Sequence, residues 1–214
     1  MGENEPSFSA KQVLQKLHEM GIVVETELDE AESYRQKFSM QRTNANQLYA
    51  TILTTFSCPM QCIYCYQKHI RNGGDMSPEI MENTTSWLKE QILKRKIKKC
   101  LITFYGGEPL MNFTPIEYIG NRMSEYCLSL GISLCLSMVT SGVLLTKKIA
   151  YNLKRIGIKY LQITLDGDKE AHDKRRFFKD GSGSFDKIWE NLRYFRKDFF
   201  ITITCNVDKT NAEA

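Results

Sequence analysis

Hydrophobic and polar positions alternate in two ways from residue 48 onward, where short apolar runs are separated by longer amphipathic stretches. The short runs predict strands and the amphipathic stretches predict helices. Ser77-Pro78, Thr114-Pro115 and Ser184 are typical of helix starts, and Gly131 and Gly157 are typical of helix ends. The pattern predicts strands at 48–54, 101–105, 132–140, 160–165 and 199–207, with helices at 78–96, 115–130, 147–156 and 185–195.

Strands that alternate with helices of this length are typical of right-handed βαβ units in a parallel sheet. Residues 46–214 are therefore predicted to form one α/β domain, whose strands all end at one edge, where such sheets bind ligands. Residues 1–45 have a different pattern, with helices predicted at 10–20 and 29–38 and a short strand at 22–24. This segment is predicted to be a small α/β appendage.

Charge and composition exclude some classes of protein. The chain has 29 basic and 25 acidic residues among 214, and a net charge of +4 is too small to indicate nucleic-acid binding. No apolar run approaches the roughly 18 residues of a membrane span, and the N-terminus lacks the pattern of a secretory signal. A cytoplasmic protein is predicted, and in that compartment the seven cysteines favour metal or redox roles over disulfides.

Three cysteines, Cys58, Cys62 and Cys65, follow the first predicted strand in one loop. Three thiolates at this spacing can hold one iron–sulfur cluster, and a cluster of four irons would keep one iron open to a small chelating molecule. The alternative is structural zinc, which needs four ligands and would have to recruit His69, but no second pair of zinc ligands is nearby. The other cysteines are predicted to pack in the core: Cys100, Cys127, Cys135 and Cys205.

Polar and glycine-rich motifs follow the next strands. Gly106-Gly107-Glu108 comes after the second strand, and glycines there allow close backbone approach to a ligand, while a carbonyl or Glu108 can accept from an ammonium group. Thr140-Ser141-Gly142 ends the third strand and is also typical of a plain turn into a helix. Thr164-Leu165-Asp166-Gly167 ends the fourth strand, and the stretch 172–176 that follows is also compatible with a local loop network.

The Cys-x3-Cys-x2-Cys spacing, with aromatic Tyr64 before the last cysteine, resembles the signature of the radical SAM superfamily. The resemblance covers about residues 48–211. It implies a parallel βα partial barrel with five of the usual six βα units, a [4Fe-4S] cluster on the three cysteines, and S-adenosylmethionine on the open iron. Members of that family cleave S-adenosylmethionine to a 5′-deoxyadenosyl radical, which abstracts hydrogen from a substrate.

The later motifs resemble the SPASM-type subgroup, which includes anaerobic sulfatase-maturating enzymes and maturases of ribosomal peptides. By this resemblance Thr164 contacts the ribose of S-adenosylmethionine and Arg176, twelve positions later, contacts its carboxylate, with Arg175 as the alternative. Asn206 matches an asparagine near the adenosine. The predicted cofactor-binding residues are Tyr64, Gly106, Gly107, Glu108, Ser141, Thr164, Arg176 and Asn206.

The resemblance implies an enzyme that modifies a peptide or protein side chain and receives electrons from a donor such as flavodoxin or ferredoxin. Two alternatives are an enzyme acting on a small molecule or cofactor precursor, and a noncatalytic module that keeps a cluster or zinc. By analogy, residues 1–45 are predicted to recognise a peptide. The sequence stops at Ala214, after the fifth predicted strand and without a cysteine-rich extension, which predicts either a fragment or a short form.

Overall fold

The computed structural model describes residues 9–19, 22–24, 28–42, 46–70 and 74–212. The chain divides into two compact units, Met1–Asn44 and Ala45–Ala214. The first unit contains helices α1 (Ala10–Glu19) and α2 (Glu30–Arg42). The strand predicted at 22–24 is wrong, because the amides of Ile22 and Val23 both donate to the carbonyl of Leu17 at 2.9 and 3.3 Å and so close the end of α1. In its described part the appendage is therefore helical.

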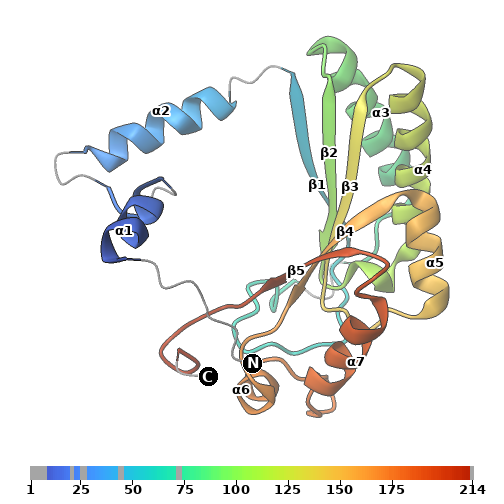
Figure 1. The fold of residues 1–214 in the computed structure, drawn as a ribbon. Coiled ribbons are helices and arrows are strands. Elements are labelled where there is room, and N and C mark those ends of the chain that lie inside the picture. The colour runs from blue at the N-terminus through green and yellow to red at the C-terminus, as the bar shows by residue number, and fades with distance from the viewer. Residues whose placement is uncertain (1–8, 20–21, 25–27, 43–45, 71–73, 213–214) are drawn as a thin grey trace, which may run out of the picture. The chain divides into compact units, whose positions relative to one another are not determined.

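The second unit is a single parallel sheet, as the sequence predicts, and its strands follow the order β1-β2-β3-β4-β5 (Figure 1). Helices α3, α4 and α5 lie on one side of this sheet (Figure 1). In the described part of the unit no helix covers the other side of the strands. The strands are β1 (Gln47–Thr55), β2 (Lys99–Gly106), β3 (Ser133–Thr140), β4 (Ile158–Thr164) and β5 (Phe200–Thr204), and the helices are α3 (Pro78–Lys94), α4 (Phe113–Ser129), α5 (Lys147–Ile156), α6 (Lys169–Arg175) and α7 (Phe185–Phe195).

Alternation along the strands separates two faces of the sheet. Ile52, Phe104, Met138 and Leu161 are buried on the helix-covered face and belong to the main hydrophobic core. The opposite side chains are half-buried or exposed. We call this opposite side the inner face; in the register of the strands it consists of Gln47, Tyr49, Thr51, Leu53, Lys99, Leu101, Thr103, Tyr105, Ser133, Cys135, Ser137, Val139, Tyr160, Gln162, Thr164, Phe200, Thr202 and Thr204.

Helix caps agree with the sequence in part. The Ser77 hydroxyl accepts from the Ile80 amide at 3.2 Å, and Gly157 ends α5 with a φ of 95°, both as predicted. The start predicted at Thr114 is wrong, since α4 begins at Phe113 directly after a short 3-10 turn, Pro109–Met111. Asn112 precedes this helix without capping it, because its side-chain amide donates to the carbonyl of Thr54 at 2.9 Å.

The four remaining cysteines do not all lie in the core. Cys100 and Cys127 are buried as predicted. Cys135 is half-buried on the inner face, and Cys205 is exposed just beyond β5, so the predicted core position is wrong for both. The reason is that, among the described residues of this unit, no helix packs on the inner face or past the end of the edge strand. Among the described helices, none is long and apolar enough to cross a bilayer.

Candidate cofactor-binding site

A cavity of about 400 Å³ opens at the edge of the sheet where the parallel strands end. Every cysteine predicted to hold the cluster lines it, as do all the predicted cofactor-binding residues except Glu108. The lining residues are Cys58, Met60, Cys62, Tyr64, Cys65, Tyr66, Gln67, Tyr105, Gly106, Gly107, Val139, Thr140, Ser141, Gln162, Thr164, Arg176, Thr204 and Asn206. The parallel topology thus brings five loops, distant in sequence, to one site.

Backbone hydrogen bonds from the end of α6 and the segment after it hold the cysteine loop. The amides of Gln61 and Ile63 donate to the carbonyls of Phe177 and Arg175 at 2.7 and 2.9 Å. The amide of Lys179 donates back to the carbonyl of Pro59 at 3.1 Å. These contacts fix the chain between the cysteines at its backbone, so the loop does not depend on a bound group alone for its conformation.

Gly106 and Gly107 pack against the start of the same loop. A Cβ on Gly107 would lie 2.3 Å from the carbonyl oxygen of Ser57, and one on Gly106 would lie 2.2 Å from that of Thr55. The Gly107 amide donates to the Thr55 carbonyl at 2.9 Å. The sequence predicts close approach of these glycines to a ligand; the structure places the protein's own backbone against them as well.

Replacing Gly107 by alanine is therefore expected to destabilise the protein by about 2–4 kcal/mol, because backbone atoms of the cysteine loop must move to admit the methyl group. Chemical denaturation measures the change in the free energy of unfolding. Gly131→Ala is the matched control: it adds the same methyl in open space at a φ of 65°, which costs roughly 1 kcal/mol. Equal stabilities of the two variants would contradict the packing argument.

Glu108 lies behind the cavity wall and is fully buried. Its carboxylate accepts from the hydroxyl of Thr140 at 2.6 Å, and from the amide and hydroxyl of Ser141 at 2.8 and 2.5 Å. It also accepts from the Leu110 amide at 3.2 Å. These bonds couple the motif after β2 to the motif after β3 and account for both hydroxyl residues, a role that the sequence motifs alone do not indicate.

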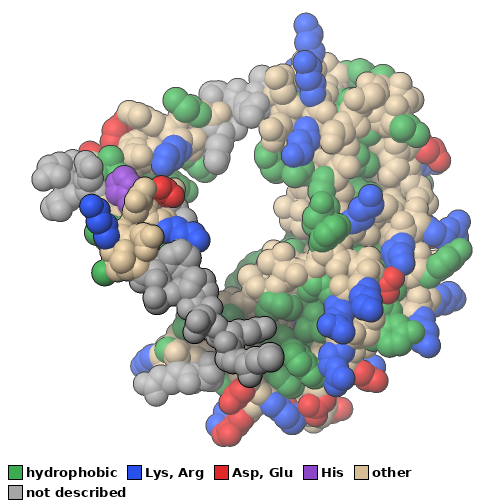
Figure 2. All heavy atoms as spheres, viewed as in Figure 1, with side chains coloured by type: hydrophobic (Ala, Val, Ile, Leu, Met, Phe, Trp, Pro, Cys, Tyr) green, Lys and Arg blue, Asp and Glu red, His purple; other side chains and the backbone are tan. Residues whose placement is uncertain are grey.

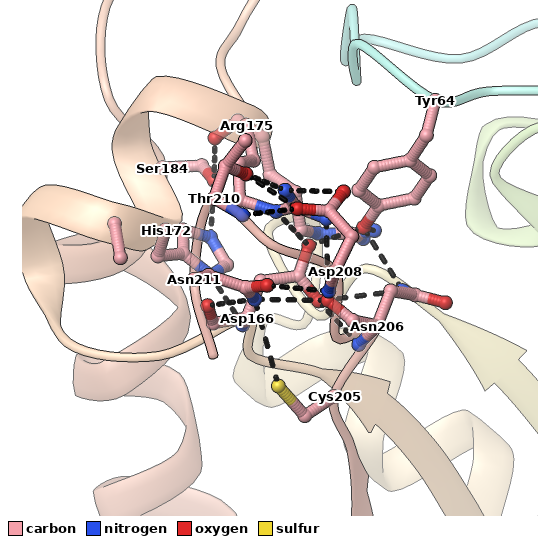
Figure 3. Close-up of polar contacts among 12 residues, drawn as sticks. Tyr64, Asp166, His172, Arg175, Ser184, Cys205, Asn206, Asp208, Thr210 and Asn211 are labelled. Carbon is pink, nitrogen blue, oxygen red and sulfur yellow. Dashed lines mark hydrogen bonds and ion pairs between the residues drawn. The ribbon is translucent and has the colours of Figure 1, made fainter. Parts of the chain in front are cut away.

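The Tyr64 hydroxyl is the centre of a polar network on the β4–β5 side of the cavity (Figure 3). It donates to the carboxylate of Asp166 and accepts from Arg176 Nη1 at 2.8 Å and from Asn206 Nδ2 at 3.0 Å. Burial, opposed by the charge of Arg176 and assisted by the bond to Asp166, raises the pKa of Tyr64 to about 12. Tyr64 is therefore neutral at physiological pH and keeps the proton that it donates to Asp166.

The two adjacent arginines have different surroundings. Arg175 is buried and donates to Asp208 at 2.9 Å, to Thr210 at 2.6 Å and to the carbonyl of Asn206 at 3.2 Å (Figure 3). Arg175 is not among the residues that line the cavity. Its guanidinium therefore holds the chain after β5 in place.

Arg176 does line the cavity. Among the described residues its side chain hydrogen-bonds Tyr64 alone, and its buried Nε has no hydrogen-bond partner there. Burial lowers the pKa of Arg176, but Cys62 and Tyr64 outweigh burial and raise it above its ordinary value. A permanent positive charge with unused donors thus faces the space beside the cysteines.

His172 supports this side of the cavity through hydrogen bonds of both ring nitrogens. Its Nδ1 accepts from the Asp166 amide at 3.2 Å, and its Nε2 lies 3.0 Å from the Ser184 hydroxyl, which donates to the Arg176 carbonyl at 2.7 Å. Burial, together with the nearby charge of Arg176, lowers the pKa of His172 to about 4. The ring is neutral at physiological pH, with its proton on Nε2.

The sequence predicts that Ser184 caps α7, but its side chain makes no capping bond. Its hydroxyl donates to the carbonyl of Arg176 instead. The carboxylate of Asp173 takes its place and accepts from the Phe185 amide at 2.8 Å. Asp173 belongs to α6, a helix that the sequence pattern does not predict. The stretch 172–176 therefore combines a local network with a cavity residue, and the two interpretations of that stretch are compatible.

The low pKa of His172 predicts a loss of stability in acid. The unfolded chain takes up a proton near the ordinary pKa of 6.5, whereas the folded chain does so only near 4. The free energy of unfolding is therefore expected to fall as the pH drops from about 6.5 to about 4, by at most about 1.4 kcal/mol per pH unit from this residue. Urea titrations of wild type and His172→Gln across this range measure it, and the difference between the proteins must shrink in acid. Parallel pH profiles would contradict the prediction.

The residues present fit an iron–sulfur cluster better than a single metal ion. In the ranges that the structure describes, no three His, Cys, Asp or Glu side chains are grouped so as to hold one ion. A [4Fe-4S] cluster does not need that convergence, because each thiolate binds a different iron. His69, the candidate fourth zinc ligand, is exposed and does not line the cavity.

The fold and the cavity define an α/β protein with a cysteine-lined ligand site at the carboxyl edge of a parallel sheet. The family model described as "Radical SAM superfamily" matches residues 52–210, and the chain belongs to this superfamily of enzymes. Membership implies a [4Fe-4S] cluster and S-adenosylmethionine as cofactors. The resemblance found in the sequence motifs is thereby confirmed at the level of the superfamily.

Relatives with different activities match this chain. It is 28% identical over 203 residues to the radical SAM cyclopropyl synthase TigE of Paramaledivibacter caminithermalis, covering 87% of this chain and 41% of the relative. It is 31% identical over 174 residues to the AdoMet-dependent heme synthase of Methanosarcina barkeri, covering 80% of this chain and 45% of the relative. The chain thus spans less than half the length of these curated relatives.

Solved structures agree on the fold. Native anSMEcpe with bound AdoMet and Cp18Cys peptide superposes with a TM-score of 0.63 at 22% identity, covering 74% of this chain and 43% of that one. At this identity the similarity establishes the partial-barrel architecture and leaves the substrate open.

Proposed function

We propose that this chain binds a [4Fe-4S] cluster through Cys58, Cys62 and Cys65, with S-adenosylmethionine beside it. We further propose that the chain directs a radical formed from S-adenosylmethionine at a peptide or protein side chain. The observation that carries the proposal is the shared cavity, which joins the three cysteines to Thr164, Arg176 and Asn206. When bound, the cluster and S-adenosylmethionine supply a 5′-deoxyadenosyl radical. A one-electron donor such as flavodoxin or ferredoxin would reduce the cluster.

In this proposal the chain's residues orient the cofactor by their chemistry. Arg176 provides a planar cation with unused donors for the carboxylate of S-adenosylmethionine. The Thr164 hydroxyl contacts the ribose. Asn206, which is hydrogen-bonded to Tyr64 and Asp166, contacts the adenosine side. Because Glu108 is fully engaged by Thr140, Ser141 and Leu110, we assign the ammonium group to backbone carbonyls near Gly106 and Gly107, with Glu108 shaping the wall.

Two observations favour a peptide substrate. A structure with the same fold, anSMEcpe, holds AdoMet and a peptide together. In the appendage, α1 leaves Val13 45% and Leu14 55% exposed, which provides an apolar surface suited to a peptide segment. We therefore also propose residues 1–45 as a peptide-recognition element. The second candidate is a small molecule or cofactor precursor, as the name of the heme synthase relative suggests.

Cleavage of S-adenosylmethionine by the anaerobically reconstituted chain tests the proposal. Dithionite-reduced protein should release 5′-deoxyadenosine, and S-adenosylmethionine should change the EPR spectrum of the reduced cluster because it binds the open iron. A noncatalytic module would load the cluster without releasing 5′-deoxyadenosine. Either this outcome or an unchanged EPR spectrum would overturn the proposal.

A further inference from the structure

The inner face of the sheet carries almost no charge. Within the five strands, all of them in the described part of the chain, the charged side chains are Lys99 and Lys159. Both stand at the amino ends of their strands; Lys159 is three residues from Gln162, or about 10 Å along an extended strand. Figure 2 agrees in showing Lys and Arg over the helices α5 and α7 and at the end where β1 and β2 begin. The inner face next to the cavity is therefore neutral.

The cavity itself holds one fixed charge. Apart from the cysteines, Arg176 is the only charged side chain among its described lining residues. Under the proposed function this guanidinium is taken by the carboxylate of S-adenosylmethionine. A second ligand that brought its own carboxylates or ammonium groups to the inner face would leave them without a partner, and unpaired charges removed from water are strongly unfavourable.

Several polar groups near the cavity on the inner face already have partners. The hydroxyls of Thr103 and Ser137 lie 2.9 Å apart, within hydrogen-bond distance. Those of Tyr105 and Tyr66 are likewise hydrogen-bonded, at 3.1 Å, and the Gln67 amide donates to Tyr66. These groups form a neutral wall whose hydrogen bonds are internal.

Gln162 differs from these residues. It lines the cavity from the middle of β4, two residues before Thr164 on the same face, and its side chain makes no hydrogen bond with any residue in the described ranges. A carboxamide offers one acceptor and two donors in one plane, which complements the N–H and C=O of a peptide group. It pairs in register with Val139 and Thr202, so its neighbours on both strands are uncharged.

We propose that the inner face receives an uncharged peptide segment as the reacting part of the substrate, and that Gln162 hydrogen-bonds a peptide group of that segment. The inference rests on the proposed function and deepens it by defining which part of a peptide reaches the cavity. It makes Gln162 a specificity-determining residue. It also disfavours polycarboxylate small molecules, for which the site offers a single cation that another ligand already uses.

Photo-crosslinking tests this without requiring turnover. A benzophenone amino acid introduced at Thr202, the register partner of Gln162, reports what lies beside that side chain. The reconstituted protein with S-adenosylmethionine, and without reductant, is irradiated with end-capped heptapeptide pools that differ only in whether the central residue is charged. Coproporphyrin III, a tetracarboxylate, serves as the small-molecule competitor. Mass spectrometry quantifies the captured peptides.

Pools with an uncharged centre should be captured at least about tenfold more than pools centred on Asp, Glu, Lys or Arg. Gln162→Leu should lower their capture about three- to tenfold, the effect of one neutral hydrogen bond, whereas Gln162→Glu should increase capture of Lys and Arg pools. Thr51→Val removes a polar group from the same face on β1, outside the cavity lining, and should leave capture unchanged.

Equal capture of acidic pools, displacement of peptides by coproporphyrin III, no capture from any pool, or an unchanged result with Gln162→Leu would each overturn the inference. Release of 5′-deoxyadenosine by the unsubstituted protein is measured separately. If that release occurs while the crosslinking fails, the proposed function stands and only the assignment of the inner face is wrong.

Discussion

Replacing Cys58, Cys62 or Cys65 by alanine, one at a time, is expected to abolish iron–sulfur cluster binding. Each thiolate would bind a separate iron, so the loss of one leaves a second iron without a protein ligand. The cysteine loop is held by backbone bonds to residues 175–179, and its fold should therefore survive each substitution. Wild type should contain about four irons per chain and show a brown colour that dithionite bleaches, and each variant should contain less than about one.

Cys127→Ala provides the control for this series. Cys127 is buried in α4 on the helix-covered face and does not line the cavity. Its substitution should leave the iron content at the wild-type level. Purification of wild type with one zinc and no capacity for iron would contradict the assignment, as would a Cys65→Ala protein with full iron content.

The strands and their parallel arrangement were predictable because they depend on local pattern and general topology. Apolar runs such as 101–105 are short, and this one is followed by the turn residues Gly106 and Gly107. Helix α5 begins and ends at residues with strong capping chemistry, Thr146 and Gly157. A parallel sheet then places every strand end at one edge. For this reason the sequence motifs predicted ten of the eighteen residues that line the cavity without any knowledge of side-chain directions.

The errors arise where a side chain serves a distant partner in place of its local one. Ser184 and Asn112 precede helices, as capping residues do, yet they bond to Arg176 and Thr54. The residues at 22–24 have the composition of a strand, but two of their amides bond to Leu17 at the end of α1. Local propensity cannot predict such competition, because the winning partner is fixed by tertiary structure.

The chemistry of the site was predictable by residue type and less so by orientation. Glu108 belongs to the predicted motif, but the sequence does not reveal that its carboxylate faces Thr140 and Ser141. The importance of Asp166 as the shared acceptor of Tyr64 and Asn206 was also missed. Its position in Thr164-Leu165-Asp166-Gly167, directly after a buried strand, was the available signal.

The sequence leaves both adjacent arginines open as ligands of the S-adenosylmethionine carboxylate, but the structure favours Arg176. Arg176→Ala is expected to weaken binding of S-adenosylmethionine by roughly 10- to 150-fold. This corresponds to about 1.5–3 kcal/mol, the contribution of a hydrogen bond to a charged group. The Nε of each arginine lacks a hydrogen-bond partner among the described residues, but only Arg176 lines the cavity. The Nη donors of Arg175 are directed at Asp208, Thr210 and the Asn206 carbonyl. Calorimetric titration of the reconstituted proteins measures the affinity, and iron analysis verifies that each variant carries its cluster.

Arg175→Ala is the matched comparison, since it removes the same side chain one position away. It should lower the melting temperature and increase hydrogen exchange at 206–211, because the chain after β5 loses its anchor, and it should affect affinity less than Arg176→Ala does. Arg176→Lys keeps the charge but loses the planar fork, so its affinity should fall between wild type and Arg176→Ala. Wild-type affinity in Arg176→Ala, combined with weak binding in a folded Arg175→Ala, would reverse the assignment and make Arg175 the carboxylate ligand.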